Sequence, residues 1–366
     1  MNQIVFNFDD IHPILKQNFI DKFQYWLLVC DAPFISTYSE PHIDDRSLGF
    51  HSEFLSLCPN IEQINLIFYH KFNEKFDLTS NRFKKFKFNS TGEQSVIQSI
   101  IVYNKDSLKC IEFMVRDQDR GQAIRLLPTL SRVKNLERLA ILFRAYYEDE
   151  FEFIRGTEQV QFVHMDQYND PIENFLTDTI SGLIDIGLLC CRLKHLKLKI
   201  HLFKSSECSQ VFETMGVFTR LTRLDLSLFA DVTDSLYSYY CGWLKGCHNL
   251  THVTLNHQID GLSPEIYSFG DMFFNRIDEN LPKLQNLCIS YPILTVEGLT
   301  SLSKLTQLQK LMINTNKFWE PGCFYKTYDI IKNNPKLMAF KMTQPVDLNI
   351  NLVFDLEQYF NDVRRE

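Results

Sequence analysis

The feature that most constrains this chain is an apolar triplet that recurs along most of its length. In each copy, apolar residues stand at relative positions 1, 4 and 6, as in Leu250, Val253 and Leu255. Ten clear copies begin at the anchor residues Ile61, Phe83, Leu108, Leu136, Leu193, Leu221, Leu250, Leu284, Leu308 and Leu337. Successive anchors lie 22 to 34 residues apart by residue number, apart from one interval of 57. A motif that recurs at such a period indicates a repeat protein.

The interval of 57 residues, between Leu136 and Leu193, is nearly two periods and predicts a degenerate copy inside it. An acidic insert, EDEFEF at 148–153, accounts for the displacement of that copy. Weak copies are expected at Thr157-Val160-Phe162 and at Phe23-Trp26-Leu28.

The spacing inside and between the triplets predicts one strand and one helix per repeat. Positions 4 and 6 lie on the same side of an extended chain, so each triplet predicts a short strand with one buried face. Between triplets the spacing becomes helical, as in LTVEGLTSLSKL at 294–305, where Thr295 is a suitable helix cap. A unit this short cannot bury its own apolar face. The units must therefore stack, with parallel strands on one side and helices on the other.

At this point the sequence resembles a known family. The L-x-x-L-x-L core at this period resembles leucine-rich repeats. The segments VTDSLYSYYCGWLKGCHNLTHVTL and LTVEGLTSLSKLTQLQKLMI resemble the cysteine-containing, ribonuclease-inhibitor-like subtype. The resemblance covers roughly Cys58 to Met342. It implies an α/β leucine-rich-repeat solenoid, curved as a horseshoe, with parallel strands on the concave face and helices on the convex face.

Three segments follow from the extent of the repeats. We expect an N-terminal cap or degenerate first repeat at 1–57, the leucine-rich-repeat array at 58–343 and a C-terminal cap at 344–366. The subtype is typical of F-box and leucine-rich-repeat substrate receptors of ubiquitin ligases. Residues 1–57 are long enough for an F-box but lack its Leu-Pro opening and its Val-Cys-x-x-Trp close. A capping helix with an imperfect repeat is the simpler interpretation.

One short stretch contains several residues that could ligate a metal: Cys241, Cys247, His248, His252 and His257. However, Cys247 stands three residues before the anchor Leu250. The same slot in other repeats holds Cys58, Val133, Cys190, Phe218, Leu281 and Leu305, which is typical of a packing position. His252 is expected on the opposite face of its strand. We therefore expect no metal, and one buried and one partly exposed thiol at Cys190-Cys191.

Composition and missing motifs narrow the function classes. The formal net charge of −7 argues against bulk attraction to nucleic acid or an anionic membrane. The first residues lack a secretory pattern, and no apolar run approaches the ~18 residues that span a bilayer. Ten cysteines without an export signal indicate reduced thiols in the cytoplasm or nucleus. No phosphate loop, H-E-x-x-H or G-x-S-x-G occurs, so neither an enzyme nor a cofactor is expected.

The strand positions that alternate with the buried ones predict a binding surface. Positions 3, 5 and 7 should face the open concave side. The expected partner-binding residues there are Lys85, Lys87, Arg138, His195, Lys197, Lys199, Arg223 and His252. Glu112 and Asp225 are the acidic exceptions, and Arg116 and Arg144 are expected at the following turns. These positions are interpreted either as solvated polar residues or as a surface for an acidic or phosphorylated protein segment.

The combined interpretation is a non-catalytic protein-protein interaction module. The resemblance implies a substrate-recognition subunit similar to F-box/leucine-rich-repeat receptors, and with it a ligase adaptor as a second partner. A ligase-independent scaffold or inhibitor of the ribonuclease-inhibitor type is the alternative. Nucleic acid is less favoured because the aromatic residues stand at buried positions rather than between exposed basic ones.

Overall fold

The computed structural model describes residues 37–43, 61–68, 83–89, 94–116, 120–144, 172–202, 205–230, 237–238, 241–259, 267–268, 271–290, 295–314 and 321–343. The chain forms two compact units, Met1–Leu193 and Lys194–Glu366. The expected weak repeats at Thr157-Val160-Phe162 and Phe23-Trp26-Leu28 lie outside the described residues.

Five described strands of the first unit form a parallel sheet in sequence order. They are β1 (Thr37–Ile43), β2 (Gln63–Phe68), β3 (Lys85–Asn89), β4 (Cys110–Arg116) and β5 (Arg138–Arg144). Strand β1 lies within the segment 1–57 that was expected to cap the array. The sequence expectation for Arg116 and Arg144 was wrong in one respect: they are the last residues of β4 and β5 and pair in register, rather than lying in turns.

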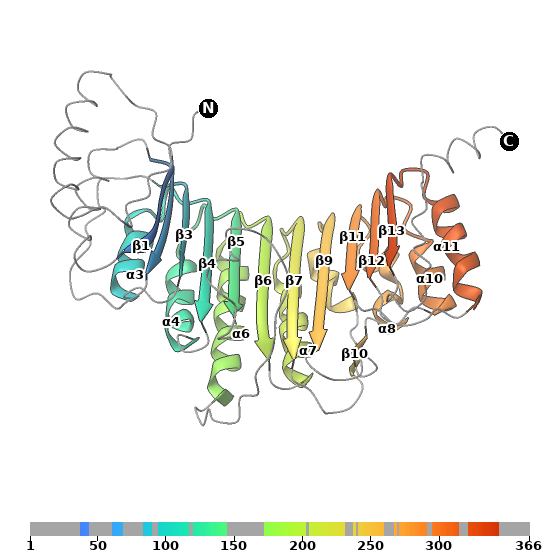
Figure 1. The fold of residues 1–366 in the computed structure, drawn as a ribbon, viewed down its shortest axis with the longest axis horizontal. Coiled ribbons are helices and arrows are strands. Elements are labelled where there is room, and N and C mark those ends of the chain that lie inside the picture. Colours follow the sequence, from blue (N-terminus) through green and yellow to red (C-terminus); the bar gives the residue numbers. More distant parts are fainter. Residues whose placement is uncertain are drawn as a thin grey trace, which may run out of the picture. The chain divides into compact units, whose positions relative to one another are not determined.

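Three helices of the first unit lie on one face of its strands (Figure 1). They are α3 (Gln94–Tyr103), α4 (Arg120–Leu130) and α6 (Ile172–Leu189). Helix α6 packs closely on α4 at Gly182. A Cβ atom added at this glycine would lie 2.5 Å from Cδ1 and 2.6 Å from Cβ of Leu127. Glycine at this position permits the close approach.

The second unit has the same strand arrangement. Its strands β6 (His195–Leu202), β7 (Arg223–Ala230), β9 (His252–Ile259), β11 (Asn286–Ser290), β12 (Lys310–Asn314) and β13 (Ala339–Thr343) are parallel and neighbour one another in that order. A separate two-residue pairing joins β8 (Tyr237–Ser238) and β10 (Tyr267–Ser268). Each unit is therefore α/β with open, parallel strands.

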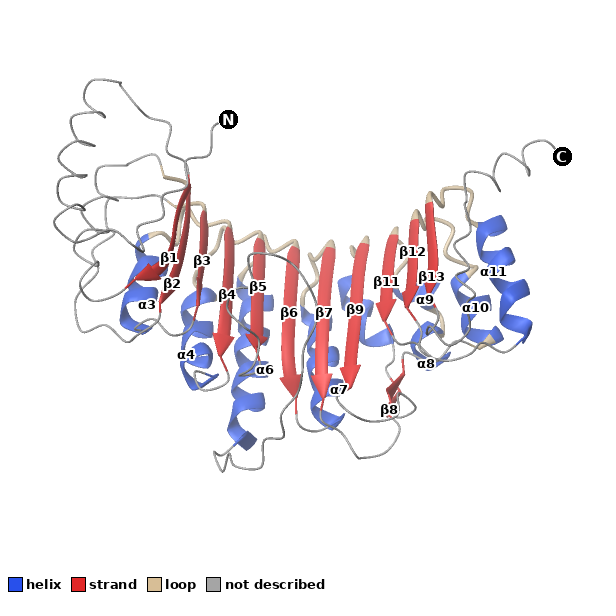
Figure 2. Cartoon of the chain, in the orientation of Figure 1, coloured by secondary structure: helices blue, strands red, loops and turns tan. Residues whose placement is uncertain are grey.

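The second unit also carries its helices on one face of the strands (Figure 2). These are α7 (Ser205–Thr214), η2 (Met215–Val217), η3 (Cys241–Cys247), α8 (Asp271–Phe274), α9 (Ile277–Asn280), α10 (Val296–Leu302) and α11 (Pro321–Asn333). The expected cap is confirmed: the Thr295 side chain accepts a hydrogen bond from the Gly298 amide at 3.2 Å. Two short 3-10 helices, η2 and η3, meet at glycines, where a Cβ atom on Gly246 would lie 1.9 Å from the Gly216 carbonyl oxygen.

The apolar triplets form the core, as the period predicts. Positions 4 and 6 pair with their equivalents on the neighbouring strands, so that Leu226, Leu255 and Ile289 lie side by side. All three are at most 1% exposed. In the first unit, the ring centroids of Phe88 and Phe113 are 5.3 Å apart in a stacked arrangement. Each such side chain contributes roughly 1.5–3 kcal/mol when fully buried.

The core also includes a position that the triplet does not contain. Val115, Ile200 and Leu228 stand two residues beyond the last triplet position and are buried. Strands β4, β6 and β7 run for seven or eight residues and so place one further side chain on the inner face. In the sequence, this further core position could have been recognised by the apolar residue at position 8 of these repeats.

Each strand is aligned by the turn that precedes it. In the repeat before β9, the Leu250 amide donates to the Cys247 carbonyl at 2.9 Å. The amides of Thr251 and His252 then share the Thr222 carbonyl of the previous repeat, at 2.9 and 3.0 Å. Equivalent pairs of amides share a carbonyl of the previous repeat before β3, β4, β5, β7, β11, β12 and β13. The outward positions of these neighbouring repeats therefore line up.

The slot three residues before the anchor is a packing position, as predicted. Cys247, Cys190 and Phe218 are buried there, while Cys58 lies outside the described residues. Cys191, next to Cys190, is exposed, which confirms the expected difference between the two thiols. Among the described residues, no helix combines the length and apolar character that crossing a bilayer requires.

Candidate functional site

The open strand face, defined as the face of the strands opposite the helices in each unit, carries the predicted outward residues. In the second unit the register forms two polar rows. One row joins His195, Arg223 and His252, and the next joins Lys197, Asp225 and Thr254. The alternation of the pleat therefore brings five of the eight expected binding residues onto three adjacent strands, with Lys199 one pleat further along β6.

Asp225 is the centre of this face. Its Oδ2 atom lies 2.8 Å from Nε2 of His195 and accepts a hydrogen bond from Nε of Arg223 at 3.0 Å. The carboxylate side chain is only 13% exposed. Its other oxygen, Oδ1, is buried and has no partner at ordinary hydrogen-bonding distance in the described part of the chain. One carboxylate oxygen thus orients two basic side chains.

These contacts keep Asp225 ionised. Burial raises the pKa of the carboxyl, but hydrogen bonds from His195, Thr254 and Arg223, together with the Arg223 charge, outweigh it and lower the pKa to about 2. A buried carboxylate stays charged only where donors compensate for its lost hydration. At neutral pH the open face therefore contains a fixed negative charge beneath Arg223.

His252 is placed where the sequence predicted, on the outward row. Its Nδ1 atom lies 2.9 Å from the Thr251 hydroxyl. Burial and the nearby Arg223 charge lower the pKa of His252, against the opposing effect of Asp225. The imidazole is therefore neutral at pH 7 and acts as a hydrogen-bonding group rather than as a cation.

The next outward row begins with Lys199 on β6 and continues with uncharged polar residues. The Asn256 amide donates to the Ser227 hydroxyl at 3.3 Å, and the Ser290 hydroxyl donates to the Asn256 carbonyl oxygen at 2.8 Å. These three residues link β7, β9 and β11 across the open face. Such cross-strand bonds satisfy the side chains and keep this part of the face polar.

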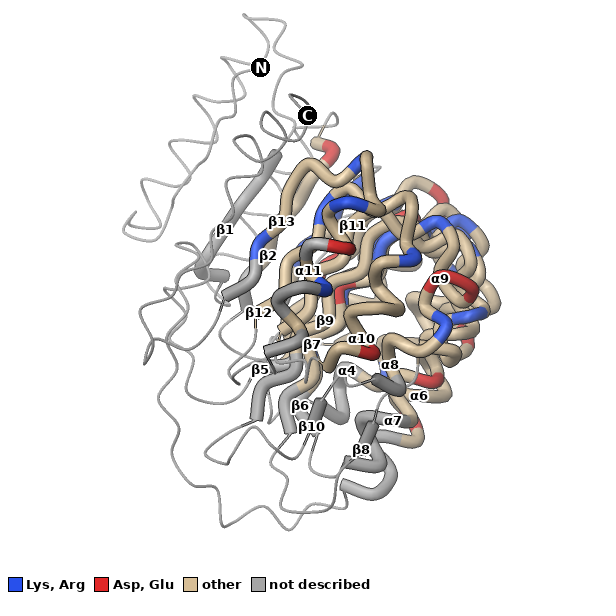
Figure 3. Tube along the Cα trace, turned by 90° about the vertical axis from the view of Figure 1, so that its right-hand side faces the viewer, with Lys and Arg blue, Asp and Glu red and all other residues tan. Residues whose placement is uncertain are grey.

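Basic residues exceed acidic ones around Asp225. Lys197 is exposed and forms no ion pair with a described residue, while the Arg223 side chain remains 50% exposed. The terminal nitrogens of Arg223 donate no hydrogen bond to the described residues. On the helix side of the same unit, Figure 3 shows both charge types: the charged positions within α9 and α10 are acidic, and α11 contains basic and acidic positions.

The first unit places its own predicted residues on β3, β4 and β5. Lys87 pairs in register with Glu112, and their side chains form an ion pair at 3.2 Å. Lys85 and Arg138 are exposed and flank Cys110 on the adjoining row. Burial raises the pKa of the Cys110 thiol despite the opposing charge of Arg138, so it remains protonated at neutral pH.

The eight predicted residues thus fall into two groups, one in each unit. The sequence identified the outward positions correctly but missed how the acidic exceptions act. Glu112 neutralises Lys87, and Asp225 anchors His195 and Arg223. The sequence did contain a signal for such pairing, because each acidic residue stands at the same strand position as a lysine on the neighbouring strand. Fewer of the predicted basic residues are therefore outside ion pairs with described residues than the sequence alone suggests.

The cysteine and histidine stretch is divided between two places. The Cys247 thiol donates to the Met215 carbonyl at 2.8 Å, and the Cys241 thiol to the Asn275 carbonyl at 3.3 Å. His252 lies on the open strand face. In the part of the chain that the structure describes, no group of three or more His, Cys, Asp or Glu residues is arranged to hold a metal ion. His257 is paired in β9, but its side chain lies outside the described residues.

Comparison with known proteins does not identify a family. No protein-family model matches the sequence, and no curated protein matches it significantly.

Proposed function

We propose that this chain is a non-catalytic protein-protein interaction module that binds an acidic or phosphorylated protein segment on its open strand face. The observation that carries the proposal is the orientation and exposure of the Arg223 side chain. Asp225 holds its guanidinium through Nε, while half of the side chain remains exposed and the terminal nitrogens make no bond to a described residue. Such a guanidinium is oriented in advance for a carboxylate or a phosphate.

The neighbouring side chains support the same ligand chemistry. Lys197 stands in register with Asp225 and adds an exposed cation on the adjacent strand. His252 and Thr254 add neutral hydrogen-bonding groups on the other side. A phosphate group or a pair of carboxylates can accept hydrogen bonds from both types of donor. A neutral or basic segment would leave these cations unpaired.

Fixed orientation also lowers the cost of binding. A free arginine side chain loses rotamer entropy when it is immobilised by a partner, at roughly 0.5–1.5 kcal/mol per side chain. The bond to Asp225 restricts Arg223 before the partner arrives. Asp225 is thus proposed as a positioning residue, and Arg223 and Lys197 as the residues that contact the partner.

The parallel strand-helix repeat in both units supports the finer interpretation as a leucine-rich-repeat solenoid, with the open strand face as its concave side. On that basis we propose a substrate-recognition subunit similar to F-box/leucine-rich-repeat receptors, acting in the cytoplasm or nucleus. The alternative is a ligase-independent scaffold or inhibitor. Co-purification of the ligase adaptor with the full chain favours the first, and adaptor-free preparations that still bind the partner favour the second.

Peptide arrays test the open strand face. The full chain is probed with matched phosphorylated, acidic and neutral peptides, and the best binder is titrated against Lys197→Glu, Arg223→Gln and Lys85→Glu. Loss of a charge-assisted hydrogen bond costs about 1.5–3 kcal/mol, so we expect affinity to fall about tenfold or more for Lys197→Glu and Arg223→Gln. Lys85→Glu tests the first unit separately.

The matched control is Lys304→Glu, an equal charge change at an exposed site after α10 on the helix side. It should leave peptide affinity unchanged, and the three lysine variants should keep their thermal midpoints. Arg223→Gln should lower its midpoint, because Asp225 loses a hydrogen-bond donor. Preference for neutral peptides, or equal affinity of Lys197→Glu, Arg223→Gln and the parent chain, would reject the proposed surface.

A further inference from the structure

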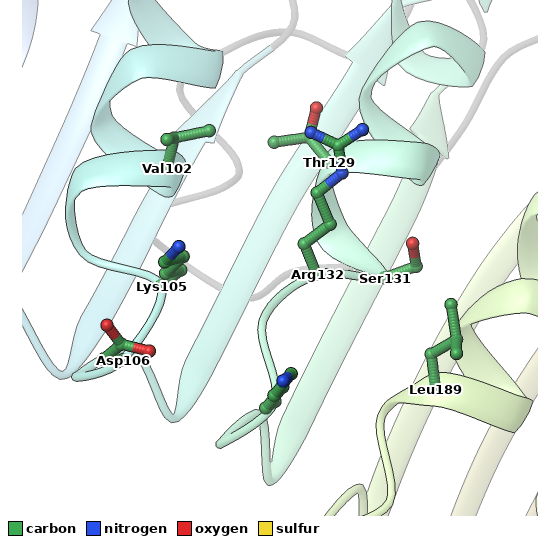
Figure 4. Close-up of a pocket in the computed structure, with 8 residues that line it drawn as sticks. Val102, Lys105, Asp106, Thr129, Ser131, Arg132 and Leu189 are labelled. Carbon is green, nitrogen blue, oxygen red and sulfur yellow. The ribbon is translucent and has the colours of Figure 1, made fainter.

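A hollow of about 390 Å³ in the first unit lies away from the open strand face. Its lining comes only from the ends of α3, α4 and α6 and from the turns that follow α3 and α4, as Figure 4 shows. The lining residues are Val102, Lys105, Asp106, Thr129, Ser131, Arg132, Lys134 and Leu189. This volume lies within the ~300–1,000 Å³ range of ligand pockets.

Two apolar side chains are exposed at the hollow. Val102 is 43% and Leu189 is 56% exposed, and they come from the last turns of α3 and α6. Single exposed apolar residues are common, but two that line one hollow form a site where further apolar surface can be buried. Figure 4 shows Arg132 between them. A cationic side chain, that of Arg132, therefore lies between the two apolar side chains.

The charges of the hollow are unbalanced. The lining contains three cations, Lys105, Arg132 and Lys134, and a single carboxylate, that of Asp106. None of these four side chains forms an ion pair with another described residue. By contrast, Lys109, on the same series of turns, is paired with Glu137 at 3.3 Å. The charged groups of the hollow are therefore available for a partner.

Helix ends account for only part of this pattern. Cations near the last turns of α3 and α4 interact favourably with the partial negative charge of the helix termini. That interaction explains why lysine and arginine stand there. It does not explain why Val102 and Leu189 remain exposed beside them, since polar residues would serve a solvated helix end equally well.

We infer that this hollow is a second docking site, for an acidic peptide segment of a partner protein in which a carboxylate is flanked by apolar side chains. The carboxylate pairs with Arg132, with Lys105 and Lys134 contacting neighbouring acidic groups, and the apolar side chains cover Val102 and Leu189. Charge complementarity selects the acidic segment, and apolar burial adds affinity. The site is independent of the proposed open-face site, so the chain can hold two segments at once.

Selection from a random 12-residue peptide display library tests the inference. The full chain is the bait, and the same chain carrying Val102→Thr, Arg132→Gln and Leu189→Gln is used for counter-selection. We expect the enriched peptides to carry Asp or Glu next to Leu, Ile, Met or Phe. Synthetic copies of these peptides should lose affinity tenfold or more on the triple variant and at least threefold on each single variant.

Two controls separate this site from others. Lys304→Gln alters the second residue after α10, as Lys105 is the second residue after α3, and it should leave affinity unchanged. Lys197→Glu should also leave it unchanged, because it alters only the open strand face. The inference is overturned if no peptide is enriched over the counter-selection, if the enriched peptides are neutral or basic, or if their affinity depends on Lys197. Unchanged urea midpoints of the single variants verify that each remains folded.

Discussion

The Nε2 atom of His195 on β6 lies 2.8 Å from Oδ2 of Asp225 on β7. The same oxygen accepts the hydrogen bond from Nε of Arg223. A single, partly buried carboxylate therefore connects two strands and orients two basic side chains on the open strand face. Both the stability of this face and the orientation of its proposed contact residue depend on Asp225.

Asp225→Asn should destabilise the chain in a pH-dependent way. The pKa is lowered from 3.8 to about 2 in the folded chain, so ionised Asp225 contributes on the order of 2 kcal/mol above pH 4. Because the folded pKa is the lower one, this contribution decreases as the pH falls from about 4 and is lost below about 2. The difference in unfolding free energy between parent and variant should fall by roughly half between pH 6 and pH 3.

Urea unfolding followed by circular dichroism measures this difference at each pH. Glu112→Gln is the matched control, because Glu112 occupies the equivalent strand position in the first unit but is 35% exposed and paired with Lys87. An exposed ion pair contributes about 0–1 kcal/mol, so this control should change little. A pH-independent loss for Asp225→Asn would contradict the assigned ionisation.

Gly246→Ala should destabilise the second unit strongly. The added Cβ would lie 1.9 Å from the Gly216 carbonyl oxygen, a backbone atom that cannot move without separating η2 from η3. Overpacking costs typically ~1–3 kcal/mol, and we expect a value at or above the upper end. The measurement is the urea midpoint of the full chain, with hydrogen exchange of 241–250 as a local probe.

Gly182→Ala provides the comparison, because its Cβ would meet a side chain, that of Leu127, at 2.5 Å. This leucine can move, so the loss should be smaller than for Gly246→Ala. Leu127→Ala should partly compensate for Gly182→Ala in a double-mutant cycle. An equal or larger loss for Gly182→Ala would show that α4 and α6 are packed more rigidly than η2 and η3.

The vicinal thiols should differ in reactivity. Cys190 is buried, and burial together with the Cys191 thiol raises its pKa to about 12, whereas Cys191 is exposed. Since the thiolate is the reactive form, iodoacetamide should alkylate Cys191 first, and Cys190 only after unfolding. Peptide mass mapping over time measures both rates. Equal rates in native buffer would indicate that the slot before Leu193 opens readily.

The period of the triplets was sufficient to predict the strands, their buried face and their parallel order. Leu226, Leu255 and Ile289 lie side by side because a fixed strand-helix unit can bury its apolar face only against an equivalent unit. The outward positions followed from the same two-residue alternation. The curvature of the array and the ligand of its open face remain predictions.

The sequence could not predict which charges would pair. Asp225 and Glu112 occupy the same strand position, yet Asp225 is 13% exposed and accepts from three donors, whereas Glu112 is 35% exposed and pairs with Lys87. That difference depends on neighbouring side chains from other repeats. The hollow beside Leu189 was missed for a similar reason, since its lining comes from three helix ends that are far apart in the sequence.

Asn104→Ala should cost about 1–3 kcal/mol of unfolding free energy, because the buried Asn104 connects two repeats. Its Oδ1 atom accepts from the Phe83 amide at 3.0 Å, and its Nδ2 donates to the Ile100 carbonyl at 2.9 Å. Truncation leaves the Phe83 amide buried without an acceptor. Asn135→Ala, which removes a more exposed 2.7 Å bond to the Asp106 carbonyl, should cost less than about 1 kcal/mol. Chemical denaturation compares the unfolding free energies of the two variants. Faster hydrogen exchange of the Phe83 amide in Asn104→Ala, but not in Asn135→Ala, would identify the lost acceptor as the cause. A protected Phe83 amide in Asn104→Ala would mean that another acceptor replaces the lost one.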